Sequence, residues 1–242
     1  TPVSCPGGQN CSPDSGVCVT GEVLVREPYL QQATPTSMTI VWRSATASNS
    51  LVHYGTTQGT RNLTATNVAV STNHIVTITG LSPATRYYYD IGSTTAIKAG
   101  GTANHFFKTS PLANDTTPFR VWALGDSGNG GANQLAVRNA MLTYTSSNPP
   151  DLMLHLGDIA YDSGTDSELT NKHFAIYKDI LRNTPSWTTL GNHEGLSTTS
   201  GSPNSTGPYY DAFVLPTSAE AGGIASGTEA YYSFDRGNAH FV

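Results

Sequence analysis

The sequence predicts two domains, an all-β sandwich followed by an α/β domain in which helices cover a partly parallel sheet. Runs with β-type alternation fill residues 23–112, and strand-type and helix-type patterns alternate after residue 119. A length of 242 residues suits one large domain or two smaller ones. We therefore divide the chain into a Cys-containing segment (1–22), a β-sandwich (23–112), a linker (113–118) and the first part of an α/β domain (119–242).

Composition excludes several classes of function. The net charge is −5, charged residues make up 12% of the chain, and no basic run occurs, so we expect no binding to nucleic acid. No stretch of about 18 apolar residues is present, so we expect no transmembrane helix and no membrane partner. A Ser- and Thr-rich chain with few charges, starting at Thr1, predicts a secreted (extracellular or periplasmic) protein whose signal peptide has been removed.

The three cysteines, Cys5, Cys11 and Cys18, lie in the first 18 residues, among Pro, Gly and Ser. A segment this short and polar cannot bury a core, so a disulfide is the expected way to order it. The count is odd, which leaves either a free thiol or a partner in further chain. A zinc site is the weaker alternative, because the cysteine spacing is poor for zinc and no histidine is near.

The first domain contains strand-type runs separated by turn-rich segments. Met38, Ile40 and Trp42 fall on one side of the first run by the period of two. The core Trp42 and the segment from Gly80 to Tyr87 resemble a fibronectin type III-like module, in which Tyr87 would fix the corner between two strands. The expected strands are 38–42, 50–55, 74–78 and 86–91.

The second domain alternates strands and helices. On the first helix we expect Val137, Met141 and Tyr144 to form the apolar face, by spacings of four and three. An apolar strand is cut at Val242, and because domains rarely end inside such a strand we expect the chain to continue. The expected elements are strands at 119–124, 151–156 and 186–190, helices at 132–144 and 167–182, and a hairpin at 231–242.

Each of the three strands of this domain ends in Gly followed by a polar residue, namely Asp126, Asp158 or Asn192. The carboxyl ends of strands in an open α/β sheet share one crevice, so we expect these side chains to converge. Carboxylates held together repel one another unless a cation lies between them. Oxygen donors with His and Tyr nearby suit iron, zinc or manganese.

The segments Gly125–Gly128, Gly157–Tyr161 and Gly191–Glu194 resemble the first three sequence blocks of the calcineurin-like metallophosphoesterases. Tyr161, with the fibronectin-like module in front, is similar to purple acid phosphatases. The resemblance implies that Asp126 and Tyr161 bind Fe(III), that Asp158 bridges two metals, and that Asn192 binds the second, divalent metal (Zn, Fe or Mn). It implies that His193 is catalytic and faces the substrate.

By this resemblance the protein is an acid phosphatase that hydrolyses phosphate monoesters with metal-bound hydroxide as the nucleophile. The family's later histidine blocks are absent, and with them three histidine ligands, so we interpret the chain as the N-terminal portion of the enzyme, incomplete at its C-terminus. A phosphodiesterase or nucleotide hydrolase on the same metal core is one alternative. An inactive binding or adhesion protein is another, if the chain truly ends at Val242. The sequence leaves a homodimer open.

Three further acidic residues near these blocks have simpler interpretations. Glu194 either orients His193 or Asn192, or is a surface residue. Asp162 and Asp166 are interpreted as solvated turn residues.

Overall fold

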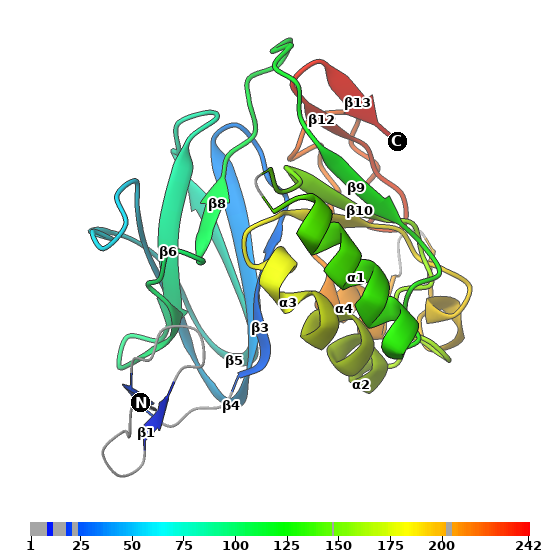
Figure 1. Cartoon of the computed structure of the whole chain (residues 1–242), viewed down its shortest axis with the longest axis horizontal. Coiled ribbons are helices and arrows are strands. Elements are labelled where there is room, and N and C mark those ends of the chain that lie inside the picture. Colours follow the sequence, from blue (N-terminus) through cyan, green and yellow to red (C-terminus); the bar gives the residue numbers. More distant parts are fainter. Residues whose placement is uncertain (1–8, 12–17, 21–23, 147, 202–204) are drawn as a thin grey trace.

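The computed structural model describes residues 9–11, 18–20, 24–146, 148–201 and 205–242. It contains the two domains side by side, a β-sandwich and an α/β domain (Figure 1). Within the described ranges, no helix has both the length and the apolar character that crossing a membrane requires.

The first domain is built from one six-stranded sheet, in which β4 is the central strand and pairs with β3, β5 and β6. β7 and β8 both pair with β6. The strands are β3 (Leu24–Gln31), β4 (Ser37–Gly55), β5 (Leu63–Thr79), β6 (Arg86–Gly92), β7 (Ile97–Gly100) and β8 (Phe106–Lys108).

β4 is continuous where the sequence predicted two strands and an intervening turn, so that prediction is wrong. The segment after residue 42 stays extended, and its pairing with β5 shifts register between Arg43 and Ser48. Ser44 is buried in the irregularity and donates to the carbonyl of Thr46 at 2.6 Å. The strand therefore passes from pairing with β3 and β5 to pairing with β5 and β6, and the sheet closes around its own core.

The sandwich core contains the predicted side of β4. Met38, Ile40 and Trp42 are each 0% exposed and lie in one apolar cluster. The tyrosine corner is also confirmed, because the backbone N–H of Ser82 donates to the Tyr87 hydroxyl at 2.9 Å. A buried phenol thus closes the turn before β6.

A separate small hairpin pairs β1 (Gln9–Cys11) with β2 (Cys18–Thr20). Its backbone register places Cys11 opposite Cys18, and Cys5 lies outside the described residues. The described part of the chain contains no disulfide, so the pairing of the cysteines stays a prediction.

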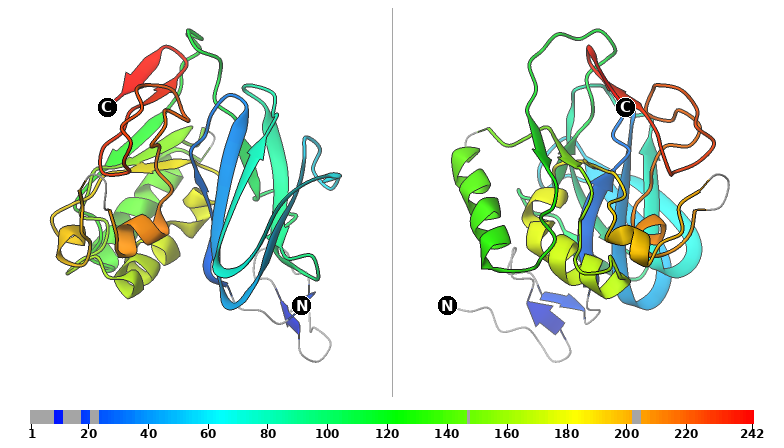
Figure 2. Two further views of the ribbon diagram at one scale, coloured as in Figure 1. Left: turned by 180° about the vertical axis from the view of Figure 1, so that it is seen from behind. Right: turned by 90° about the vertical axis from the view of Figure 1, so that its right-hand side faces the viewer.

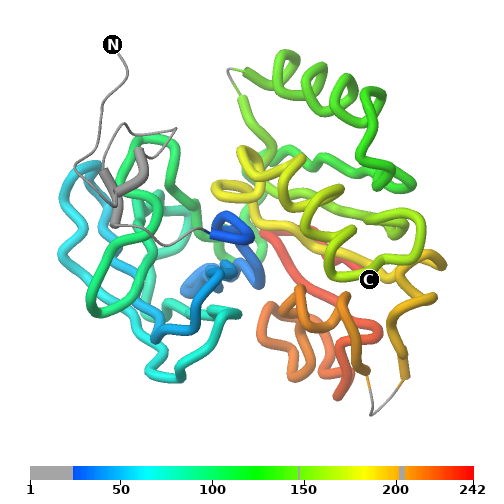
Figure 3. The backbone as a smooth tube through the Cα atoms, turned by 90° about the horizontal axis from the view of Figure 1, so that it is seen from below, coloured from blue at the N-terminus to red at the C-terminus, as the bar shows by residue number. Residues whose placement is uncertain are grey.

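The second domain has a parallel three-stranded sheet in the order β11-β10-β9. Helices cover one face of this sheet, and the β12–β13 hairpin packs on the other (Figures 2 and 3). The elements are β9 (Val121–Leu124), α1 (Ala132–Tyr144), β10 (Leu152–His155), α2 (Asp166–Glu168), a π-helical segment (Leu169–Phe174), α3 (Ala175–Leu181), β11 (Ser186–Thr188), a 3-10 turn (Glu194–Leu196), α4 (Pro208–Ala212), β12 (Phe234–Arg236) and β13 (Ala239–Phe241).

β10 is buried on both faces, as its apolar run predicted. Met153 packs into the cluster beneath the helices, whereas Leu152 packs with Trp187 and the hairpin. Trp187 stacks on Phe234 with ring centroids 3.8 Å apart. These contacts fix the hairpin against the sheet.

α1 has the predicted bounds, but of the three residues predicted for its apolar face only Met141 packs against the core. Val137 is 59% and Tyr144 91% exposed, whereas Gln134 is 5% exposed. The Gln134 amide donates to the carbonyl of Lys172 at 2.7 Å and accepts from the N–H of Gly130 at 2.6 Å. Because these hydrogen bonds satisfy a polar side chain, the helix packs through it.

The two domains share an apolar cluster at their interface. Tyr29 of β3 and Val41 of β4 belong to the cluster that lies beneath the helices of the α/β domain. Tyr29 donates its hydroxyl hydrogen to the carbonyl of Ala212 at 2.6 Å. The Gln31 side chain is fully buried and donates to the Ser186 carbonyl at 2.9 Å. The part of the sandwich that carries Tyr29, Gln31 and Val41 therefore packs against the α/β domain.

Candidate functional site

The loops after β9 and β10 are joined by backbone hydrogen bonds. The N–H of Asp126 donates to the Gly157 carbonyl at 3.2 Å, and that of Gly128 donates to the Asp158 carbonyl at 3.3 Å. The N–H of Tyr161 donates to the carbonyl of Gly128 at 2.8 Å. The parallel strands bring these loops to one edge of the sheet, as the sequence predicted.

Two carboxylates and a phenol meet at this edge. The Tyr161 hydroxyl donates to Asp126 Oδ1 at 3.0 Å and lies 3.4 Å from Asp158 Oδ2. Asp158 is 8% exposed, and its Oδ1 accepts from the backbone N–H of His193 at 3.1 Å. Desolvation and the two neighbouring carboxylates raise the pKa of Tyr161, so the phenol keeps its proton in the protein alone.

The backbone at both aspartates is in the left-handed region. Asp126 has a φ of 51° and Asp158 a φ of 49°. This conformation costs a non-glycine residue about 1 kcal/mol, and such strain is concentrated at functional sites. The backbone therefore adds an independent reason to interpret both aspartates as functional.

The loop after β11 brings His193 to the group. Its Nδ1 lies 2.5 Å from the carbonyl of Asp162, and its ring meets the Tyr161 ring edge-on with centroids 4.2 Å apart. A carbonyl only accepts, so Nδ1 carries a hydrogen and Nε2 is the nitrogen that can take up a further proton. Asn192, the residue before it, is exposed and is not part of the hydrogen-bonded group in the described part of the chain.

Glu194 is a buried component of this loop system, so its interpretation as a surface residue is wrong. It is 0% exposed and accepts from the N–H groups of Ala160 and Gly191, each at 2.9 Å. It thereby ties the loop after β10 to the loop after β11. No sequence pattern distinguished this role from that of a surface carboxylate.

Asp166 is half exposed, as expected for a solvated residue, but it begins α2 instead of lying in a turn. Its carboxylate pairs with Arg26 and Arg43 of the sandwich, each at 2.6 Å. Asp162 is exposed, as expected for a turn, but its carbonyl fixes the His193 ring.

The donor set fits a cation in part. Asp126, Asp158 and Tyr161 present hydrogen-bonded oxygens to one another, and a cation among them would relieve the charge repulsion and favour the phenolate. In the described part of the chain, no group of three or more His, Cys, Asp and Glu side chains is arranged to hold a metal ion. The residues that fit a cation are therefore the oxygen donors of the loops after β9 and β10, namely Asp126, Asp158 and Tyr161.

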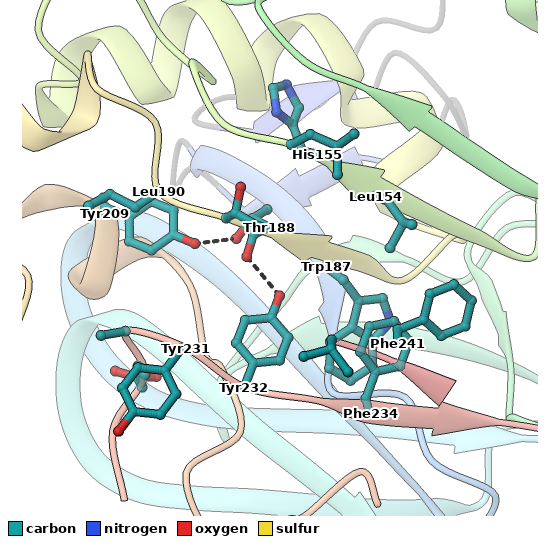
Figure 4. A pocket seen from close by; sticks show the side chains of 15 residues that line it. Leu154, His155, Trp187, Thr188, Leu190, Tyr209, Tyr231, Tyr232, Phe234 and Phe241 are labelled. Atoms are coloured by element: carbon teal, nitrogen blue, oxygen red, sulfur yellow. Dashed lines mark hydrogen bonds between the residues drawn. The ribbon is translucent and has the colours of Figure 1, made fainter. Parts of the chain in front are cut away.

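A cavity of about 250 Å³ lies on the hairpin face of the sheet (Figure 4). Trp187, Phe234 and Phe241 form its apolar wall, and Tyr232 donates to the carbonyl of Thr188 at 2.7 Å. None of the candidate site residues lines it. Its composition is that of an apolar core, which is unsuited to a phosphate group.

Comparisons with known proteins show the family and the domain arrangement. Residues 119–239, half of the chain, match the family model of the calcineurin-like phosphoesterases, and the chain belongs to this family. Residues 27–109 match the model of the purple acid phosphatase N-terminal domain. Within the family the chain thus has the two-domain arrangement of the purple acid phosphatases.

Individual proteins that resemble this chain are named as acid phosphatases. Purple acid phosphatase 15 of Arabidopsis thaliana is 28% identical over 201 residues, covering 70% of this chain and 34% of the relative. Acid phosphatase type 7 of Danio rerio is 28% identical over 221 residues, covering 85% and 44%. The chain spans less than half the length of these relatives.

Among solved structures, the purple acid phosphatase PPD1 from yellow lupin (Lupinus luteus) seeds superimposes with a TM-score of 0.64 at 19% identity. The match covers 91% of this chain and 45% of that one. It shows that the two domains share the fold of that protein.

Proposed function

We propose that this chain carries part of an active site that hydrolyses phosphate monoesters in mild acid. The observation that supports the proposal is the hydrogen-bonded group of Asp126, Asp158 and Tyr161 at the carboxyl ends of parallel strands. The names of the relatives, purple acid phosphatase and acid phosphatase, support the same reaction.

In this proposal Asp126 and Tyr161 would hold Fe(III), Asp158 would be a ligand shared by two metals, and Asn192 would contribute to the binding of a divalent metal (Zn, Fe or Mn). Such a pair of ions neutralises phosphate charge and lowers the pKa of water. His193 has its Nδ1 hydrogen held by the Asp162 carbonyl, so Nε2 is the position from which it gives a proton to the leaving group.

Substitution Asp158→Asn tests the proposal. It keeps the shape of the side chain but removes the charge, so turnover of p-nitrophenyl phosphate at mildly acidic pH should fall more than ~100-fold, and bound metal should fall with it. Asp179→Asn is the matched control, because Asp179 lies on α3 and pairs with Arg182 at 3.1 Å, away from the site. A fully active Asp158→Asn protein would refute the assignment.

The same assay separates the alternatives. Turnover of bis(p-nitrophenyl) phosphate in preference to the monoester would favour a phosphodiesterase. Absence of turnover of either ester by the metal-loaded full-length protein would favour an inactive binding protein.

We also propose that the protein is secreted and that its N-terminal segment contains a disulfide. The support is the low content of charged residues, 12%, and the clustering of Cys5, Cys11 and Cys18. Mass mapping of the protein from the culture medium, with and without reduction, tests both statements.

A further inference from the structure

A short helical segment beside the site, residues 165–172, holds the loop that carries Tyr161. The Glu168 carboxylate accepts from the backbone N–H of Asp162 at 2.5 Å and from that of Ser163 at 3.1 Å. It also accepts from Thr165, from the N–H at 3.1 Å and from the hydroxyl at 2.9 Å. One carboxylate thus accepts hydrogen bonds from three residues, Asp162, Ser163 and Thr165, between Tyr161 and α2.

Lys172 holds the same loop through the carbonyl of Tyr161. Its Nζ donates to the carbonyl of Tyr161 and pairs with Glu168 Oε1 at 3.2 Å. Glu168 and Lys172 therefore bind the N–H and the C=O of the peptide group that joins Tyr161 to Asp162. The carbonyl of Asp162 in turn fixes the ring of His193.

The segment is anchored at its other end to the β-sandwich. Arg26 and Arg43, paired residues of β3 and β4, both bind the Asp166 carboxylate at 2.6 Å. Arg26 is 3% exposed, donates to the Thr170 hydroxyl at 3.0 Å and lies 4.5 Å from the centroid of the Phe174 ring. A buried guanidinium with these partners is a rigid attachment.

We infer that Glu168 and Lys172 are positioning residues for Tyr161 and His193, and that the β-sandwich supports them through Arg26, Arg43 and Asp166. This inference rests on the proposed function. The sandwich is then part of the support of the active site, and not a separate binding module. The path from sandwich to site is continuous, since Arg26 and Arg43 bind Asp166 and the backbone of the same short helical segment connects Asp166 to Glu168 and Lys172.

The charges along this path persist in mild acid. Desolvation acts to raise the pKa of Glu168, but the hydrogen bonds from Thr165, Ser163 and Asp162 outweigh it and lower the pKa to about 2. Desolvation also acts to raise the pKa of Asp166, but the bound arginines outweigh this effect and lower the pKa. Both carboxylates therefore stay ionised at the pH at which the proposed enzyme works.

Hydrogen–deuterium exchange of the metal-free protein tests the hold on the loop. In Glu168→Gln, amides in peptides covering 159–168 should exchange at least ~10-fold faster, because the carboxylate that accepts from them is lost. Asp166→Asn should speed exchange in the same peptides by a smaller factor. Asp179→Asn is the control and should leave them unchanged, and peptides covering 86–92 report that the sandwich core is intact.

Kinetics of the metal-loaded protein test positioning. Glu168→Gln and Lys172→Met should lower kcat ~10- to 100-fold with KM within about twofold, because the reacting groups are displaced while the phosphate site remains. Unchanged exchange in Glu168→Gln, or faster exchange with unchanged kcat, would overturn the inference. If wild-type protein has no phosphatase activity but exchange responds as expected, the hold on the loop stands and its catalytic role fails with the proposed function.

Discussion

At Gly191 a single hydrogen in place of a side chain allows the loop after β11 to approach Asp158. A Cβ at this position would overlap the backbone nitrogen and Oδ1 of Asp158, and would lie 2.7 Å from Glu194 Oε2. Gly191→Ala should therefore displace Asp158 and destabilise the fold by ~1–3 kcal/mol. Thermal unfolding and phosphatase activity measure the two effects.

Gly195→Ala is the matched control, because nothing lies within 4 Å of a Cβ there. The two glycines are four residues apart in the same loop, so a difference between the variants isolates the contact with Asp158. Equal behaviour of the two would contradict the close approach.

Part of the candidate site could be predicted from single residues and part could not. Gly-Asp at the ends of two strands predicted the meeting of Asp126 and Asp158, because strand order alone brings such loops together. The roles of Glu194 and Glu168 depend on which backbone N–H groups lie within reach, and that is fixed only by the tertiary fold. One signal was available, since Thr165 and Glu168 have the spacing of a capping box, which the structure contains.

At the scale of elements, hydrophobic periodicity predicted where helices and strands lie in the sequence better than it predicted which of their faces is buried. The helix at Ala132–Tyr144 was predicted with these bounds, but its buried side is set by the hydrogen bonds of Gln134. Likewise, the alternation of Met38, Ile40 and Trp42 predicted the sandwich core. Val41, on the opposite side, could not be predicted to pack against another domain, because a period of two describes one strand and not its neighbours.

The turn before β6 gives a prediction at the same scale. Tyr87→Phe removes the hydroxyl that accepts from the Ser82 N–H and leaves the ring stacked on Phe107 at 5.4 Å. Loss of one hydrogen bond should lower the free energy of unfolding by about 1 kcal/mol. Urea unfolding measures the change. Tyr88→Phe is the control, because the Tyr88 hydroxyl makes none of the hydrogen bonds found in the described part of the chain, and an equal loss in both variants would contradict the corner's role.

For the whole molecule, the shared apolar cluster makes the two domains mutually dependent. Tyr29 and Val41 of the sandwich belong to one apolar cluster with Phe174 and Phe213 of the α/β domain, and Arg26 pairs with Asp166 of α2. Unfolding either domain would expose this cluster, which favours a single cooperative transition. The support of the site by the sandwich and the stability of the chain therefore depend on the same interface.

The stability of the whole molecule should depend on pH through His155, which is buried behind the site. Its Nε2 lies 2.9 Å from the Ser127 hydroxyl, and its ring lies 5.4 Å from that of His173. Burial lowers the pKa of His155 from 6.5 to about 4, with a smaller opposing effect of Asp158, and burial also lowers the pKa of His173. Between pH 6.5 and 4 the unfolded chain therefore takes up protons that the folded chain does not.

This contribution of His155 is fully present above pH 6.5 and is lost as pH falls towards 4, on the order of 3 kcal/mol in all. His155→Gln keeps a group that can bond to Ser127 but cannot titrate. Urea unfolding from pH 8 to pH 4 should show a constant difference between the variant and wild type above pH 7, and a difference that shifts in favour of the variant below pH 6.5. Parallel curves over the whole range would show that His155 does not couple protonation to unfolding. The expected result means that the proposed enzyme works in the pH range in which its own buried histidine lowers its stability.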